Sequence, residues 1–132
     1  VAWVDAHYRT YPAKESRAIA GLSMGGFHAM QISRHYPDMF DYVGLFSAAI
    51  YRGEEGVAMY ENLEEGIADQ FARGVALYWI GIGKDDFLYE ENVRFRAMLD
   101  AADYEYEYRE SAGGHTWRNW RIYLAEFVEK IF

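Results

Sequence analysis

The stretch RAIAGLSMGG at residues 17–26 contains the pattern G-x-S-x-G, in which Ser23 lies between Gly21 and Gly25. The residues before Ser23 are typical of a short buried strand, and a helical pattern follows the glycines. A serine in this context is typical of a nucleophile held on a tight turn between a strand and a helix. We expect glycine on both sides because a β-carbon there would collide with the neighbouring strand and helix. Ser23 is therefore the candidate nucleophile, and it requires a base and an acid.

The rest of the chain predicts alternating strands and helices. Buried or half-buried strands are predicted at 17–22, 42–48, 75–82 and 104–108. Helices are predicted near the N-terminus and at 26–36, 90–102 and 117–131. The Glu- and Gly-rich segment 49–73 is expected to cover the site as an irregular or partly helical excursion. This alternation predicts one α/β domain over residues 1–132, with about four parallel strands flanked by helices.

Carboxylates and a histidine follow Ser23 in the chain order that serine hydrolysis on such a sheet requires. Asp85 and Asp86 come after the predicted strand 75–82, and His115 comes after the strand 104–108. Because the carboxyl ends of parallel strands meet at one edge of a sheet, we expect these side chains to converge there. His115 is the candidate general base, and an aspartate would fix its tautomer and stabilise its cation. The residues alone leave Asp85 and Asp86 as alternatives for the acid.

Two further residues are assigned to the site by their positions beside this machinery. Met24 follows the nucleophile, so its backbone N–H is the candidate oxyanion-hole donor. Trp117 lies two residues beyond His115 and is the candidate substrate-binding side chain. The other histidines are expected on solvated helix faces or in packing roles: His7, His28 and His35.

Composition excludes several classes of function. The net charge is -8 and the acidic residues are scattered, which argues against a nucleic-acid partner and against an anionic membrane. The chain has no cysteine, so disulfides, thiolate metal sites and a cysteine nucleophile are excluded. The acidic pairs at 54–55 and 64–65 are typical of solvated carboxylates and not of metal ligands. Hydrolysis through a serine acyl-enzyme uses neither a metal nor an organic cofactor, so none is expected. No stretch has the length of a membrane span, and the first residues lack the regions of a signal peptide.

Three segments give the sequence a family resemblance: RAIAGLSMGG at 17–26, YWIGIGKDDFLYEEN at 78–92 and YEYRESAGGHTWRNWR at 106–121. Together they resemble the esterase D and feruloyl-esterase-like branch of the α/β-hydrolases. The matches run along most of the chain, and GLSMGG and GGHTW are the specific segments. The resemblance implies an α/β-hydrolase fold and a carboxylic-ester hydrolase that works through an acyl-enzyme.

The resemblance also implies roles for individual residues and a class of substrate. It places Ser23, Asp86 and His115 in the triad positions, with Asp86 chosen because the family's acid lies three residues after a glycine such as Gly83. The implied substrate is a small-molecule or oligosaccharide ester carrying a feruloyl or acetyl group, which would suit a secreted or periplasmic protein. A thioester such as S-formylglutathione is the alternative substrate within the family.

Intact members of this family carry about as much chain again before the nucleophile strand, including the loop that supplies a second oxyanion N–H. The chain is therefore interpreted as the C-terminal half of such an esterase. An alternative of another class is a non-catalytic segment that packs against its N-terminal half or another copy, since the strand before Ser23 would have an open edge.

Overall fold

The computed structural model describes residues 1–51, 53 and 55–131, so Glu54 of the first acidic pair lies outside the described residues. Strands and helices alternate, and η marks a short 3-10 helix. The elements are α1 (Ala2–His7), η1 (Lys14–Ser16), β1 (Ala18–Leu22), α2 (Met24–His35), β2 (Tyr42–Phe46), η2 (Ala58–Tyr60), α3 (Leu63–Ala72), β3 (Leu77–Gly83), α4 (Tyr89–Ala101), β4 (Glu107–Ser111) and α5 (Trp117–Val128).

The four strands form one parallel sheet in the chain order β1-β2-β3-β4. Every residue of β3 is buried, whereas both edge strands are partly exposed. Because the central strands are covered on both faces, their sequences are almost continuously apolar. The predicted fold class, about four parallel strands flanked by helices, is confirmed.

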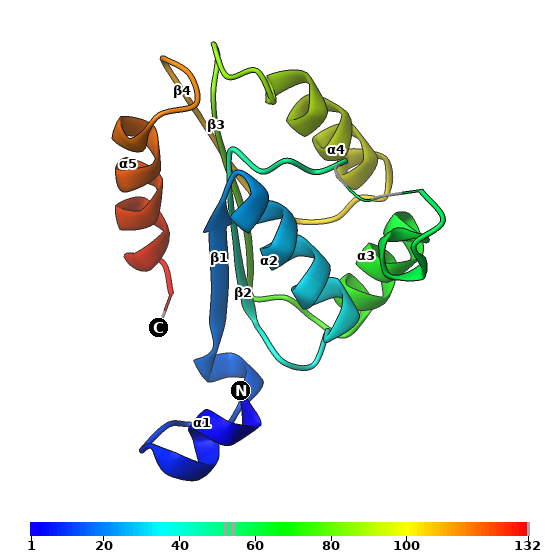
Figure 1. The fold of residues 1–132 in the computed structure, drawn as a ribbon, viewed down its shortest axis with the longest axis vertical. Coiled ribbons are helices and arrows are strands. Elements are labelled where there is room, and N and C mark those ends of the chain that lie inside the picture. The colour runs from blue at the N-terminus through cyan, green and yellow to red at the C-terminus, as the bar shows by residue number, and fades with distance from the viewer. Residues whose placement is uncertain (52, 54, 132) are drawn as a thin grey trace.

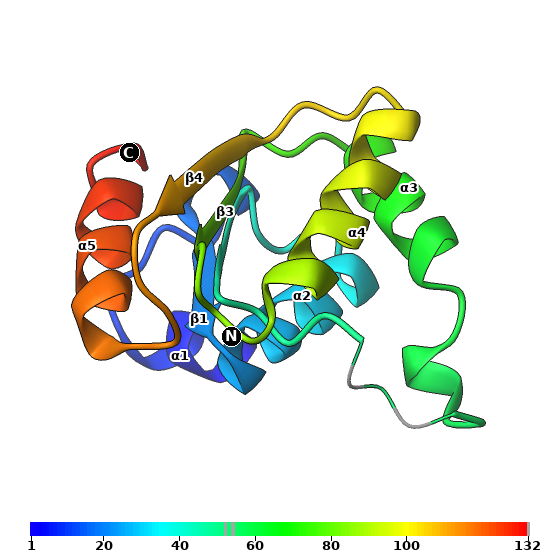
Figure 2. The ribbon, with the colours of Figure 1, turned by 90° about the horizontal axis from the view of Figure 1, so that it is seen from above.

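Helices cover the two faces of the sheet unequally (Figure 1). α5 lies alone on one face, and α2, α3 and α4 lie on the other (Figure 2). The α5 face has an aromatic core in which Phe46 and Trp79 meet edge to face, with ring centroids 5.4 Å apart. The opposite face has a larger core that includes Met30, Leu45 and Phe95, all at most 1% exposed. Both cores hold the strand ends in fixed positions beneath the candidate site.

The fourth strand lies later in the chain than its sequence pattern predicts. β4 pairs with β3 from Trp79↔Glu107 to Gly83↔Ser111, and residues 104–106 precede it. Tyr104 instead stacks flat on Phe71 of α3, with ring centroids 4.4 Å apart and planes 4° apart. The alternation of aromatic and acidic residues at 104–108 therefore reflects packing against a helix for its first half.

The segment 49–73 contains a helix and lies beside α2. Its residues 63–72 form α3, and the buried guanidinium of Arg34 donates hydrogen bonds to the carbonyl oxygens of Met59, Glu61 and Asn62 at 2.8, 3.2 and 3.2 Å. Arg34 lies in the last turn of α2, whereas Ser23 precedes its first turn. Residues 59–72 are thus held at the end of α2 far from Ser23, and for them the expectation that the segment covers the site is wrong. Ala49, at the start of the segment, does contact the site, through its N–H bond to the Ser23 carbonyl oxygen at 3.1 Å.

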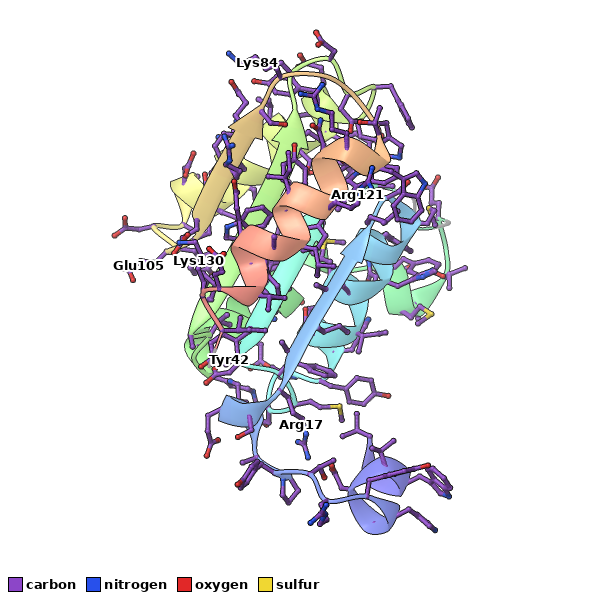
Figure 3. All side chains as sticks on the ribbon, turned by 90° about the vertical axis from the view of Figure 1, so that its left-hand side faces the viewer. Arg17, Tyr42, Lys84, Glu105, Arg121 and Lys130 are labelled. Atoms are coloured by element: carbon purple, nitrogen blue, oxygen red, sulfur yellow. The ribbon has the colours of Figure 1, made fainter. Side chains whose placement is uncertain are left out.

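β1 is an edge strand whose only partner among the described strands is β2. Figure 3 shows it beside α5, at the margin of the face that this helix covers. α1 lies away from the sheet (Figure 1) and has no buried residue, and an ion pair of 2.6 Å between Asp5 and Arg17 connects it to the start of β1. Within the described part of the chain, no helix combines the length and apolarity needed to cross a membrane.

Candidate active site

Ser23 occupies the turn between β1 and α2 in a backbone conformation that residues other than glycine rarely adopt. Its φ is 53° and its ψ is -119°. The backbone of the β2 exit holds it on both sides: Ser23 N–H donates to the carbonyl oxygen of Phe46 at 2.9 Å, and Ala49 N–H donates to that of Ser23 at 3.1 Å. Strained residues of this kind persist where the surroundings over-determine them, and they cluster at functional sites.

The glycines around Ser23 allow β1, α2 and the β2 exit to approach closely. A β-carbon on Gly21 would overlap the carbonyl group of Gly25, and one on Gly26 would lie 2.6 Å from the β-carbon of Ala48. A β-carbon on Gly25 would meet nothing within 4 Å. The expected collision of a β-carbon therefore holds for Gly21 and is wrong for Gly25. Gly25 takes part in the close approach through its backbone carbonyl group, which lies against Gly21.

Three strand ends bring Ser23, Asp86 and His115 into one hydrogen-bonded chain. His115 Nε2 lies 2.9 Å from Ser23 Oγ, and His115 Nδ1 lies 3.0 Å from each carboxylate oxygen of Asp86. A carboxylate accepts, so the network assigns the proton to Nδ1 and leaves Nε2 free to accept from the serine hydroxyl. The Asp86 side chain is fully buried, and that of His115 is 18% exposed. The imidazole thus connects a shielded carboxylate to the accessible serine.

The structure brings Asp86, and not Asp85, to the histidine. Asp86 Oδ1 also accepts the backbone N–H of Leu88 at 3.0 Å, which fixes the carboxylate within its own loop. Asp85 is exposed, and its backbone N–H donates to the carbonyl oxygen of Gly113 at 3.1 Å. The two neighbouring aspartates therefore hold the acid loop in different ways, one by its side chain and one by its backbone.

The loop that carries His115 is closed by a side chain that the sequence did not single out. Buried Asn119 donates from Nδ2 to the carbonyl oxygens of Ala112 at 3.1 Å and Gly114 at 3.0 Å. A β-carbon on Gly83 would overlap the carbonyl group of Gly113, so the end of β3 and the histidine loop are in direct backbone contact. The only sequence signal for Asn119 is its place in the first turn of the helix after His115.

Aromatic rings surround the imidazole. Phe87 is 72% exposed, and its ring centroid lies 4.6 Å from that of His115. Trp120 is buried and meets the imidazole edge on, at 4.8 Å and 86°. Trp117 is 65% exposed and contacts Trp120 at 5.3 Å. The sequence singled out Trp117, but it missed Phe87, which follows Asp86 directly, and Trp120.

The surface beside Ser23 offers a backbone donor and an apolar hollow. Met24 opens α2, and an N–H in the first turn has no carbonyl partner within the helix. A hollow of about 220 Å³ lies between β1 and α5, and most of its lining is apolar: Ala20, Gly21, Leu22, Phe46, Trp117, Trp120, Arg121 and Leu124. Trp117 thus lines a hollow that reaches Leu22, the residue directly before the serine.

The remaining histidines lie outside this arrangement. All three are exposed. His7 donates from Nδ1 to the carbonyl oxygen of Trp3 at 2.7 Å, and His35 donates from Nε2 to that of Met59 at 2.6 Å. His28 contacts the neighbouring ring of Phe27. Across residues 1–51, 53 and 55–131, no three His, Asp or Glu side chains gather in a way that would hold a metal ion.

A parallel sheet that presents a serine on a strained strand-to-helix turn, bonded to a histidine and an aspartate from two later strand ends, defines an α/β-hydrolase fold. A family model described as "Putative esterase" matches residues 1–131, and the chain belongs to this esterase family. The resemblance found in the sequence is therefore confirmed.

Individual relatives agree with this assignment. The chain is 32% identical over 130 residues to an endo-1,4-beta-xylanase/feruloyl esterase of Xylanibacter ruminicola, covering 98% of this chain and 16% of that protein. It is 26% identical to an acetyl esterase of Caldicellulosiruptor saccharolyticus, covering 88% of this chain and 54% of that one. A solved ferulic acid esterase superimposes with a TM-score of 0.84 at 29% identity, covering 100% of this chain and 58% of that one. The chain thus spans less than two thirds of each relative.

Proposed function

We propose that the protein hydrolyses carboxylic esters through an acyl-enzyme on Ser23. The observation that carries this proposal is the hydrogen-bonded chain from Ser23 Oγ through the His115 imidazole to the buried Asp86 carboxylate. A serine hydroxyl is a weak nucleophile until a base accepts its proton as it attacks, and His115 Nε2 lies at the distance this requires.

The reaction needs only the ester, a water molecule and the groups at the site. Ser23 Oγ bonds to the ester carbonyl carbon while its proton passes to His115 Nε2, and the carbonyl oxygen becomes an oxyanion. The carbon–oxygen bond to the alcohol then breaks, and His115 returns the proton to the leaving alkoxide. A water molecule then attacks the acyl-enzyme carbonyl carbon while His115 accepts its proton. The bond to Ser23 Oγ breaks, His115 returns the proton to this oxygen, and the acid is released. Asp86 stabilises the transient imidazolium, and the Met24 N–H is the proposed donor to the oxyanion.

The proposed substrate is an ester whose acyl group is feruloyl or acetyl and whose alcohol is a carbohydrate. Two observations support this class. Phe87 and Trp117 expose aromatic surface beside the imidazole and the hollow, which suits an aromatic acyl group or a sugar face. Two relatives carry the names feruloyl esterase and acetyl esterase.

Replacement of the nucleophile tests the proposal. Ser23→Ala should abolish hydrolysis of methyl ferulate and p-nitrophenyl acetate and should abolish labelling by a fluorophosphonate probe, because no other group can carry the acyl or phosphonyl adduct. Ser33→Ala is the matched control, since Ser33 is a buried serine of α2 whose hydroxyl bonds, among the described residues, the local carbonyl oxygen of Met30 at 3.1 Å. Turnover retained by Ser23→Ala contradicts the proposal. A wild-type chain that stays unlabelled favours the non-catalytic packing segment.

A further inference from the structure

We propose that Trp120 and Ser47 act together as positioning residues that hold the His115 imidazole against Ser23. This inference rests on the proposed ester hydrolysis and deepens it. It assigns a role to the buried hydrogen bond between Trp120 and Ser47, which joins residues 73 positions apart in the chain.

Trp120 supports one side of the imidazole. Its indole meets the His115 ring edge on, at 4.8 Å between centroids, and the exposed ring of Phe87 lies 4.6 Å from the same imidazole. The indole cannot move freely, because it is 8% exposed and its Nε1–H donates to Ser47 Oγ at 3.0 Å. A tryptophan whose ring is packed and whose N–H is bonded has a single orientation.

Ser47 connects this indole to the nucleophile turn. It directly follows Phe46, whose carbonyl oxygen accepts the Ser23 N–H, and it lies two residues before Ala49, whose N–H bonds the Ser23 carbonyl oxygen. The backbone N–H of Ser47 donates to the carbonyl oxygen of Gly81 at 2.7 Å, which fixes the segment to β3. Residues 46–49 thus hold Ser23 by their backbone and Trp120 by the Ser47 hydroxyl.

Trp120 and Ser47 together restrict a rotation of the imidazole that its hydrogen bonds to Asp86 leave free. The carboxylate of Asp86 holds the imidazole at Nδ1, and a ring held at one end can still pivot. A pivot about Nδ1 would carry Nε2 away from Ser23 Oγ, 2.9 Å distant. The Trp120 ring, packed against the imidazole at 86°, restricts that pivot, and the Ser47 bond keeps the indole in place. The distance from Ser23 to His115 is thereby set by a second route besides their own hydrogen bond.

The backbone conformation of Ser47 would suit glycine better than serine, which indicates that the serine hydroxyl has a role at this position. Its φ is 45°, in the left-handed region that glycine adopts without strain. Ser47→Gly therefore removes the hydroxyl and relieves backbone strain in one change, so a loss of activity in this variant does not arise from a less favourable backbone.

Trp120→Phe is the complementary change, since it keeps a ring and removes the Nε1–H. Tyr123→Phe is the matched control: it removes a buried hydroxyl of α5 that bonds Ser111 Oγ at 2.5 Å and is not in ring contact with His115.

The kinetic test compares these variants with the wild type. Displacement of a reacting group by about 1 Å costs about 100-fold in rate, so a partial release of the imidazole should lower kcat for methyl ferulate about ten-fold or more. KM of Ser47→Gly should stay within about two-fold, because Ser47 does not line the hollow beside Ser23, whereas Trp120 does. Ser47→Gly should remain folded at the assay temperature, because relief of the positive φ offsets part of the cost of the lost hydrogen bond. Tyr123→Phe should keep the wild-type kcat.

An imidazole signal that needs no substrate separates this proposal from the proposed function. In a protein labelled with ¹⁵N-histidine, NMR should show His115 as one tautomer with its Nδ1 proton in a persistent hydrogen bond, and Ser47→Gly and Trp120→Phe should broaden or lose that proton signal. The wild type could show an ordered His115 signal that both variants disturb and still neither turn over esters nor react with a fluorophosphonate. That result overturns the proposed hydrolysis and supports the positioning role. Variants whose His115 signals and labelling rates match the wild type overturn the positioning role.

Discussion

At the scale of single residues, the site depends on which of two adjacent carboxylates reaches the imidazole. Asp86 has a fully buried side chain with both oxygens 3.0 Å from His115 Nδ1, whereas Asp85 is exposed. The residues alone left both open, and the choice of Asp86 came from the family resemblance. In the structure the buried Asp86 carboxylate has His115 as the hydrogen-bonding partner that a buried carboxylate needs, and its role as the acid stays a prediction.

Asp86→Asn and Asp85→Asn form a matched pair at this scale. An asparagine at 86 can donate to Nδ1 and so favours the wrong imidazole tautomer, and we expect kcat to fall about 10³- to 10⁴-fold. Asp85→Asn should change kcat less than about three-fold, because its contribution to the loop comes from the backbone. Kinetics with p-nitrophenyl acetate measure both. A larger loss in Asp85→Asn than in Asp86→Asn would reverse the assignment.

At the scale of elements, the nucleophile turn shows how a strand and a helix are brought together without side chains between them. β1 passes beneath the start of α2, and a β-carbon on Gly21 would overlap the carbonyl group of Gly25. Gly26 lies against Ala48 at the exit of β2 in the same way. The G-x-S-x-G pattern therefore encodes an approach between elements as well as a turn.

Two alanine substitutions separate these roles. Gly21→Ala should lower the free energy of unfolding by about 1–3 kcal/mol, because the backbone of α2 has to shift to admit the methyl group. Gly25→Ala places its methyl group in open space within a helix and should raise the free energy of unfolding by up to about 1 kcal/mol. Urea denaturation followed by tryptophan fluorescence measures both. Equal effects of the two substitutions would contradict the packing argument.

At the scale of the whole molecule, Glu110 joins three segments around the acid loop. Its carboxylate accepts hydrogen bonds from the hydroxyls of Tyr89 in α4 and Tyr108 in β4, at 2.7 and 2.9 Å, and pairs with Lys84 at 3.3 Å. The Tyr89 bond first, then those of Tyr108 and Lys84, hold the pKa of Glu110 below its ordinary value of 4.5. The loop that carries Asp86 is therefore bounded by residues that meet at one ionised carboxylate.

This contact makes stability depend on pH in a defined direction. Because the pKa of Glu110 is lower in the folded state, its contribution is present above the ordinary value of 4.5 and is lost as the pH falls through the folded pKa. Glu110→Gln should therefore lower the melting temperature at neutral pH, and the difference from the wild type should shrink as the pH falls below 4.5. Thermal melts from neutral pH down to pH 3 measure this. A difference that is constant across that range would show that the Glu110 charge plays no part.

The sequence by itself determined the features that are encoded locally. Continuous apolar runs predicted β2 and β3 because both strands are buried on both faces, and the G-x-S-x-G pattern placed Ser23 between a strand and a helix. The order of Ser23, the aspartates and His115 along the chain also follows from local patterns, since each comes just after a predicted strand. β4 was misplaced by three residues because Tyr104 packs on Phe71, a contact that no local pattern shows.

Only the tertiary structure decided which distant residues meet. The imidazole of His115 is in ring contact with both Phe87 and Trp120, and the indole of Trp120 bonds Ser47 from a different strand end. Such contacts depend on the parallel register of the strands and on how α5 packs on its face of the sheet. Sequence periodicity specifies which face of an element is apolar, but the partner across the interface is fixed only when the elements pack.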